Sequence, residues 1–164
     1  MRRILIALLL PFFLTACAES VWAPDEAVAR ARYVSDEPPS ITLITVIRKL
    51  GDEGAHSGLI INASQRVIFD PAGTWHHPTV PERNDVHYGI TPRMKAFYID
   101  YHARETFDVL EQTVVVSPEV AEKALRVVEA NGAVAKSLCG SSVSSVLRQI
   151  PGFEHVGRTL FPKK

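Results

Sequence analysis

His56, Asp70 and Cys139 are residues whose types could form a catalytic set of base, orienting acid and nucleophile. Cys139 lies in the run SLCGSSVSSVL, where Ser137 is a predicted N-cap that places the thiol in the first turn of a helix. Unpaired amide groups and the positive end of the helix dipole favour a thiolate at that position. The His56 imidazole would take the thiol proton and later protonate a leaving group, while Asp70 would hold the imidazole tautomer. The set therefore predicts covalent catalysis by a cysteine.

Two strands and one helix must bring these side chains together. His56 opens the predicted strand HSGLIIN, and Asp70 ends the next one, RVIFD, so that neighbouring strands place the carboxylate near the imidazole. In the predicted helix over residues 137–150, the apolar side chains that share a face with Cys139 are Val143, Val146 and Ile150. That face must point into the domain, so we expect Cys139 to lie against the sheet and not on the open surface.

Each residue also has a plain structural interpretation. Cys139 could be a buried, inert cysteine, His56 a histidine that ends a strand, and Asp70 a turn residue before Pro71. The three residues together, in this order along the chain, indicate a catalytic set more specifically than any one of them does alone.

The N-terminal run MRRILIALLLPFFLTAC has the features of an export signal, with two arginines before a short apolar stretch. Leu14-Thr15-Ala16-Cys17 resembles a bacterial lipobox, which implies that residues 1–16 are a signal peptide and that Cys17 carries lipid. The sequence holds two cysteines, so Cys139 would remain as an unpaired thiol in an oxidising compartment. Such a thiol is either buried and inert or retained for its reactivity.

The remaining pattern predicts an α+β domain with a small antiparallel sheet packed against helices. Residues 17–40 are expected to form a lipidated tether with one short helix, and residues 41–164 the domain. Strands are predicted over residues 41–49, 56–62, 66–70 and 107–116. Helices are predicted to begin after Thr91, after Ser117 and at Ser137. Residues 71–90 show little periodicity and are predicted to form a binding loop or lid.

The order of these motifs resembles the circularly permuted branch of the NlpC/P60 family, within the papain-like superfamily. The matching pieces are His56-Ser57-Gly58 with Leu59-Ile60-Ile61, then Val67-Ile68-Phe69-Asp70, then Leu138-Cys139 and its serine-rich helix. The resemblance runs from about His56 to Ile150. It implies a permuted papain-like fold and a thiol hydrolase or acyltransferase that cleaves an amide or (thio)ester bond through an acyl-enzyme. Many relatives have His or Glu as the third residue, where this chain has Asp70.

Composition and charge limit the partners of the chain. It balances 18 basic residues against 18 acidic ones, and loss of Arg2 and Arg3 with the signal leaves a net charge of about −2. Nothing in the sequence indicates the clustered basic surface that a nucleic-acid partner would need. We expect a monomer attached to the membrane through lipid on Cys17. Ala18 lacks the Asp that retains lipoproteins in the inner membrane, which implies the outer membrane, facing the periplasm.

The substrate is not specified by the sequence. Trp75 and Tyr88 lie in the predicted loop and are candidate substrate-binding residues, for cell-wall peptides or for lipids. The predicted chemistry needs no metal or organic cofactor. Two alternatives stay open: a zinc site formed by His76, His77 and His87 with Asp70, and a non-catalytic lipoprotein that keeps the fold as a binding module.

Overall fold

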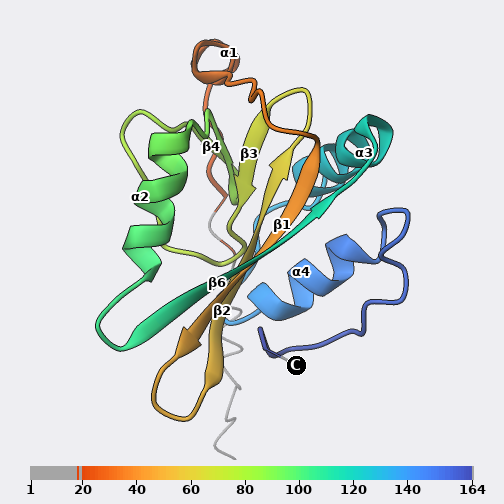
Figure 1. Ribbon diagram of the computed structural model, residues 1–164. Helices are drawn as coiled ribbons and strands as arrows, with labels where there is room; N and C mark the ends of the chain where they lie inside the picture. Colours follow the sequence, from red (N-terminus) through yellow and green to blue (C-terminus); the bar gives the residue numbers. More distant parts are fainter. Residues whose placement is uncertain (1–17, 19, 164) are drawn as a thin grey trace, which may run out of the picture.

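The computed structural model describes residues 18 and 20–163, so the expected signal peptide and lipidated Cys17 lie outside the described residues. A six-stranded antiparallel sheet forms the centre of the fold, with strand order β4-β5-β3-β2-β1-β6 (Figure 1). The strands are β1 Ser40–Arg48, β2 Glu53–Asn62, β3 Arg66–Phe69, β4 Glu82–Arg83, β5 Val86–Tyr88 and β6 Phe107–Val115. The helices are α1 Asp25–Ala31, α2 Pro92–His102, α3 Pro118–Glu129 and α4 Cys139–Leu147. The predicted α+β class with an antiparallel sheet is confirmed.

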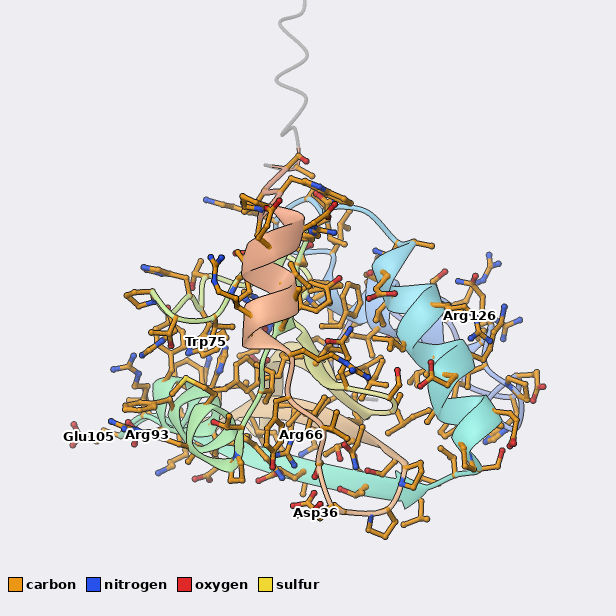
Figure 2. The ribbon with its side chains drawn as sticks, turned by 90° about the horizontal axis from the view of Figure 1, so that it is seen from above. Asp36, Arg66, Trp75, Arg93, Glu105 and Arg126 are labelled. Atoms are coloured by element: carbon orange, nitrogen blue, oxygen red, sulfur yellow. The ribbon has the colours of Figure 1, made fainter. Side chains whose placement is uncertain are left out.

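Helices cover both faces of the sheet because its central strands are apolar on both faces. In β2, Leu59 and Ile61 pack with α3 and α4, whereas Ile60 packs with Tyr98 of α2. Seen from above, α2 and α3 lie on opposite sides of the strands (Figure 2). Burial of each large aliphatic side chain in these two clusters contributes about 1.5–3 kcal/mol. The two clusters hold the sheet in place between its helices.

The helix starts follow local capping chemistry at two of the predicted positions. The Thr91 hydroxyl accepts a hydrogen bond from the Met94 backbone N–H, and the Ser117 hydroxyl accepts one from Val120. The prediction for α4 was wrong in its cap: Leu138 is the N-cap, without a side-chain hydrogen bond, and Ser137 has a positive φ of 71°. The helix therefore begins at Cys139 itself, two residues later than predicted.

The segment from 71 to 90 contains a small hairpin that its sequence did not predict. Asn84 and Asp85, with φ values of 45° and 68°, form the tight turn between β4 and β5. β5 pairs with β3, which extends the sheet on that side. The rest of the segment, from Pro71 to Pro81, forms the loop that leads from β3 to the hairpin.

The segment before β1 contacts the sheet through a buried arginine. The Arg66 guanidinium donates to the backbone carbonyl of Ile90 at 2.7 Å and to Glu37 at 3.1 Å, and it stacks on Tyr33. The Arg66 backbone N–H also donates to the Tyr33 carbonyl at 2.9 Å. Residues 33–37 are thereby fixed against β3. In the part of the chain that the structure describes, no helix has the length and apolar character to cross a membrane.

The chain after α4 folds back along that helix. Arg148 donates to the carbonyls of Glu154 and Val156, and the Thr159 N–H donates to Ser144. The segment then passes Gly140, where a Cβ atom would lie 2.9 Å from the Leu160 carbonyl oxygen. It ends beside Gly54, where a Cβ atom would lie 2.4 Å from the Lys163 backbone nitrogen. Both positions therefore need glycine. The last described residues lie beside the first turn of α4 (Figure 1).

Candidate active site

An unpaired length of β2 is the place where the helix with Cys139 meets the sheet. β3 ends at Phe69, opposite Leu59, so residues 53–58 of β2 pair with β1 only. α4 begins beside this free edge, and the Ser57 backbone N–H donates to the Cys139 sulfur. The pairing of β1 with β2 also shifts register between Val46 and Ile47, next to His56. Such a bulge re-aims the side chains beside it.

His56 and Asp70 form the hydrogen bond that the sequence predicts. His56 Nε2 and Asp70 Oδ1 are 2.6 Å apart, and Asp70 is almost fully buried. Burial alone would raise the pKa of Asp70, but the hydrogen bond and the positive charge of His56, with the Tyr98 hydroxyl, hold it below its usual value. The carboxylate is therefore ionised beside the imidazole.

The Cys139 thiol is in side-chain hydrogen-bond contact with His56. Because Nε2 is used by Asp70, the ring nitrogen that remains for the sulfur is Nδ1. Burial raises the pKa of the thiol, but the hydrogen bond and charge of His56, together with the N–H groups of Ser57 and Gly140, lower it below its ordinary value. Cys139 is 7% exposed, so the thiolate lies at the base of the site and not on the surface.

His56 is stabilised as an imidazolium by its two neighbours. Burial lowers the pKa of His56, but the hydrogen bonds and negative charges of Asp70 and Cys139 outweigh burial and raise it to about 10. Sulfur and imidazole therefore form a thiolate–imidazolium pair, in which the proton resides on the ring. This state has the nucleophile already ionised and a general acid beside it.

Two residues of α2 complete the surroundings of this pair and were missed by sequence reasoning. The fully buried Tyr98 hydroxyl donates to Asp70 Oδ1 at 2.7 Å. The His102 ring stacks on His56 with centroids 5.3 Å apart and an angle of 6° between planes, and its Nδ1 lies 2.9 Å from the Tyr98 carbonyl. Burial lowers the pKa of His102, so a neutral ring faces the charged one. The sequence signal is limited to their spacing: Tyr98 and His102 are four residues apart on a predicted helix and so share one face of it, which does not say what that face contacts.

Two glycines make room for the carboxylate. A Cβ atom on Gly73 would lie 1.7 Å from Asp70 Oδ2, and one on Gly58 would lie 2.8 Å from the Tyr98 hydroxyl. The Asp70 carboxylate can reach His56 and Tyr98 together only because both positions lack a side chain.

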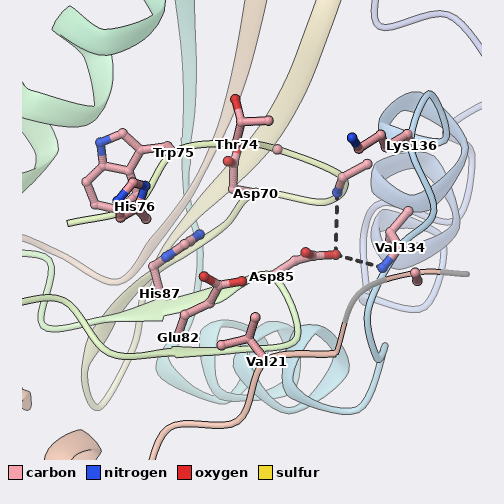
Figure 3. Close-up of a pocket in the computed structure, with 13 residues that line it drawn as sticks. Val21, Asp70, Thr74, Trp75, His76, Glu82, Asp85, His87, Val134 and Lys136 are labelled. Carbon is pink, nitrogen blue, oxygen red and sulfur yellow. Dashed lines mark hydrogen bonds between the residues drawn. The ribbon is translucent and has the colours of Figure 1, made fainter. Parts of the chain in front are cut away.

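A cavity in the described structure adjoins this site without reaching the thiol. It measures 610 Å³ and is bordered by the loop after β3, the β4–β5 hairpin and the loop before α4 (Figure 3). Trp75 and Asp70 line it, whereas Cys139 and His56 do not. Tyr88, the other predicted substrate-binding residue, lies away from it in the core beneath α3, with its hydroxyl donating to Glu129 at 3.2 Å. Of the two aromatic candidates, the structure places only Trp75 at a cavity.

The histidines of the zinc alternative do not gather. Within residues 18 and 20–163, one group of three potential metal ligands lies close together, and it is His56, Asp70 and His102. Its 2.6 Å contact between Nε2 and Oδ1 is a hydrogen-bond distance. Two zinc ligands at about 2.1 Å from a tetrahedral ion would lie further apart. The group fits a shared proton better than a metal ion. The alternative trio His76, His77 and His87 forms no such group with Asp70.

No protein-family model, no curated protein and no solved structure matches this chain.

Proposed function

We propose that this protein is a cysteine-dependent hydrolase or acyltransferase that cleaves an amide or (thio)ester bond through an acyl-enzyme. The observation that supports it is the continuous contact from Cys139 through His56 to Asp70, in which the sulfur is held as a thiolate. An inert structural cysteine needs neither an imidazolium beside it nor a buried carboxylate behind that ring. The finer fold assignment, a permuted papain-like architecture, belongs to this proposal and is supported by the order of strand, strand and helix.

The proposed reaction begins with the Cys139 thiolate. The sulfur attacks the carbonyl carbon, and the carbonyl oxygen becomes an oxyanion that the Cys139 backbone N–H, at the first position of α4, can stabilise. The intermediate collapses to a thioester as the bond to the leaving group breaks, and His56 gives its proton to that group. Neutral His56 then takes a proton from water, or from a second acceptor, which attacks the thioester and releases the sulfur as thiolate. The imidazolium and thiolate are restored.

Asp70 and Tyr98 act in this scheme through His56. Asp70 fixes the ring with Nδ1 toward the sulfur, and Tyr98 holds the carboxylate. The pKa of Tyr98 is raised well above its usual value by burial and by the Asp70 charge, so its hydroxyl stays a donor. Both are positioning residues.

Acylation by an activated ester tests the proposal without knowledge of the substrate. With p-nitrophenyl acetate, the purified full chain should gain one acetyl group on Cys139, detected by mass spectrometry of the peptide. Cys139→Ser should lose this adduct, and His56→Ala should form it at least about tenfold more slowly. His155→Ala, which removes an exposed histidine, is the matched control and should behave as wild type. Equal acetylation rates in wild type and His56→Ala would refute the catalytic pair and favour the binding-module alternative.

The proposed location is the cell envelope, with lipid on Cys17 anchoring the protein to the outer membrane on its periplasmic side. Leu14-Thr15-Ala16-Cys17 supports this proposal. In cells fed a labelled fatty acid, the wild-type protein should take up label and fractionate with membranes, whereas Cys17→Ser should lose the label and either become soluble or accumulate as precursor. Cys139→Ser is the control, since it removes the other cysteine and should keep the label. An unlabelled, soluble wild-type protein would contradict the proposed anchor.

A further inference from the structure

The 610 Å³ cavity beside Asp70 is lined by an unusual set of titratable groups. Four of them are Asp70, directly after β3, and Glu82, Asp85 and His87 of the β4–β5 hairpin; the other two are His76 and Lys136 (Figure 3). None of the four takes part in the proposed reaction except Asp70, whose Oδ1 faces His56. The lining combines these charged and polar groups with the apolar side chains of Val21, Trp75 and Val134, which suits a ligand with one charged end.

The basic neighbours of the two hairpin carboxylates are His76 for Glu82 and His56 for Asp85, and Lys136 borders the same cavity. Burial raises the pKa of Glu82 and of Asp85, and the charge of Asp70 raises both further. Asp85 Oδ2 accepts the Val134 N–H at 2.8 Å, which fixes it at the cavity wall. Among the described residues, no lysine, arginine or histidine forms an ion pair with Glu82 or Asp85. The cavity therefore holds negative charge that a cationic ligand would stabilise.

Two buried polar atoms in the cavity wall also lack hydrogen-bond partners. They are Asp70 Oδ2 and His87 Nδ1, on residues that are 1% and 2% exposed. Burial lowers the pKa of His87 to about 4, so its ring is neutral and one of its nitrogens can accept a hydrogen bond. Unpaired acceptors of this kind are costly to bury, and a donor placed in the cavity would relieve the cost.

These groups do not gather as the ligands of a metal ion would. No three of the four have ligand atoms that come together as the His56 group does, within the part of the chain that the structure describes. A bare ion needs donors at about 2.0–2.6 Å from one centre. An ammonium nitrogen bonds its acceptors at about 2.8 Å and so spans a wider set. It offers three donors, and the cavity offers carboxylate and imidazole acceptors.

We propose that this cavity binds a primary ammonium group, held by Glu82 and Asp85 with His87, while Trp75 packs against the carbon chain that bears it. Trp75 lines the cavity and stands edge-on to His87, with ring centroids 5.0 Å apart. Lys136, which is exposed at the rim, borders the same cavity and belongs to the loop that leads into Cys139. The cavity is thus a subsite for an amine-bearing substrate. This role as a subsite rests on the proposed function, whereas binding of the ammonium group does not depend on it.

Binding can be measured on the purified full chain by NMR titration with n-butylammonium chloride at constant ionic strength. The Trp75 indole N–H and the Val134 amide should shift saturably, because both lie in the cavity wall. n-Butanol, which has the same carbon chain without the charge, should produce no saturable shift. Glu82→Gln should weaken binding of n-butylammonium by about tenfold or more, since a hydrogen bond to a charged group is lost. Glu105→Gln, which removes an exposed carboxylate elsewhere, is the matched control and should bind as wild type.

Equal shifts with butanol and butylammonium, or wild-type affinity in a folded Glu82→Gln, would overturn the proposal. Binding should also weaken as the pH falls through the raised pKa values of Glu82 and Asp85, because protonation removes the charge that the ammonium needs. The titration requires no turnover. A protein that binds butylammonium but fails to form the acetyl adduct keeps the ammonium site and loses its catalytic role, so the two failures are separate.

Discussion

His56→Ala should slow the alkylation of Cys139 by iodoacetamide about 10- to 100-fold at pH 6. In the wild type, the hydrogen bond and charge of His56 hold the thiol pKa below its ordinary value, so we expect more thiolate at mildly acidic pH than in the variant. A thiol with the ordinary pKa of 9.0 is roughly 0.1% ionised at pH 6. The wild type gains rate from its larger thiolate fraction but loses part of this gain, because a thiolate of lower pKa is a weaker nucleophile. The expected ratio of the two alkylation rates is therefore smaller than the ratio of the two thiolate fractions.

The measurement is the alkylation rate between pH 5 and pH 10 for wild type and His56→Ala. The wild-type profile should be flat through neutral pH, whereas the variant should rise only near the ordinary thiol pKa. Since the His56 pKa is raised to about 10, the imidazolium persists to that pH and imposes no change between pH 7 and pH 9. His155→Ala controls for loss of a histidine and should follow the wild type. Superimposable profiles for wild type and His56→Ala would show that the thiol ionises without His56.

Cys139→Ala should give the protein a pH-dependent stability that the wild type lacks. In the proposed ion pair the folded wild type holds one proton, on His56, beside a thiolate. Midway between pH 6.5 and pH 9 the unfolded chain also holds about one, on the thiol, because its histidine has an ordinary pKa of 6.5 and its thiol one of 9.0. Equal proton counts give no slope from this pair in the free energy of unfolding.

Burial lowers the pKa of His56, and removal of the thiol leaves Asp70 as the group that raises it; we expect the hydrogen bond and charge of Asp70 to keep this pKa above its ordinary value in the folded variant. When the pKa of a histidine is higher in the folded state than in the unfolded chain, protonation of that histidine stabilises the fold. The stabilisation is complete below the unfolded pKa of 6.5, and it is lost as the pH rises toward the folded pKa. The free energy of unfolding of Cys139→Ala should therefore fall, relative to wild type, by up to about 1.4 kcal/mol per pH unit above pH 6.5.

Urea unfolding at pH 6.5, 7.5 and 8.5 measures this difference. Other titrating groups are common to both proteins and cancel in the comparison. The double variant His56→Ala/Cys139→Ala removes the proton site itself and should return to the wild-type slope. Parallel curves for wild type and Cys139→Ala would mean that Asp70 alone does not keep His56 protonated in the folded variant, which would remove the support that Asp70 gives to the proposed ion pair.

The contact between His56 and Asp70 could be predicted from the sequence because it is local. The two strands that carry them are joined by a short turn, and antiparallel pairing then places the end of one beside the start of the other. The position of Cys139 was predicted by the apolar face of its helix, although its cap was wrong because Ser137 adopts a positive φ that no sequence pattern indicates. Local pattern and short-range pairing thus account for the three central residues.

The contribution of α2 could not be predicted in the same way. Tyr98 and the apolar residues around it form an ordinary buried helix face, and nothing local says which face of the sheet the helix will cover. The strands β4 and β5 are two and three residues long, and they exist because β3 offers them an edge to pair with. The cavity beside Asp70 depends on that hairpin, since Glu82, Asp85 and His87 all belong to it.

The return of the chain along α4 has a practical consequence for anyone who labels this protein. Lys163 lies against Gly54, two positions before His56, and Leu160 lies against Gly140, directly after Cys139. An affinity tag or fluorescent fusion at the C-terminus would thus emerge beside the nucleophile and could block access to it. Because the N-terminus is expected to carry the lipid, neither end suits a tag.

The exposed tip of the β1–β2 hairpin, at Leu50 and Gly51, also lies close to the path of the tail through Asp52 and Lys163. The turn after α2, around Arg104 and Glu105, is exposed and is the better insertion point.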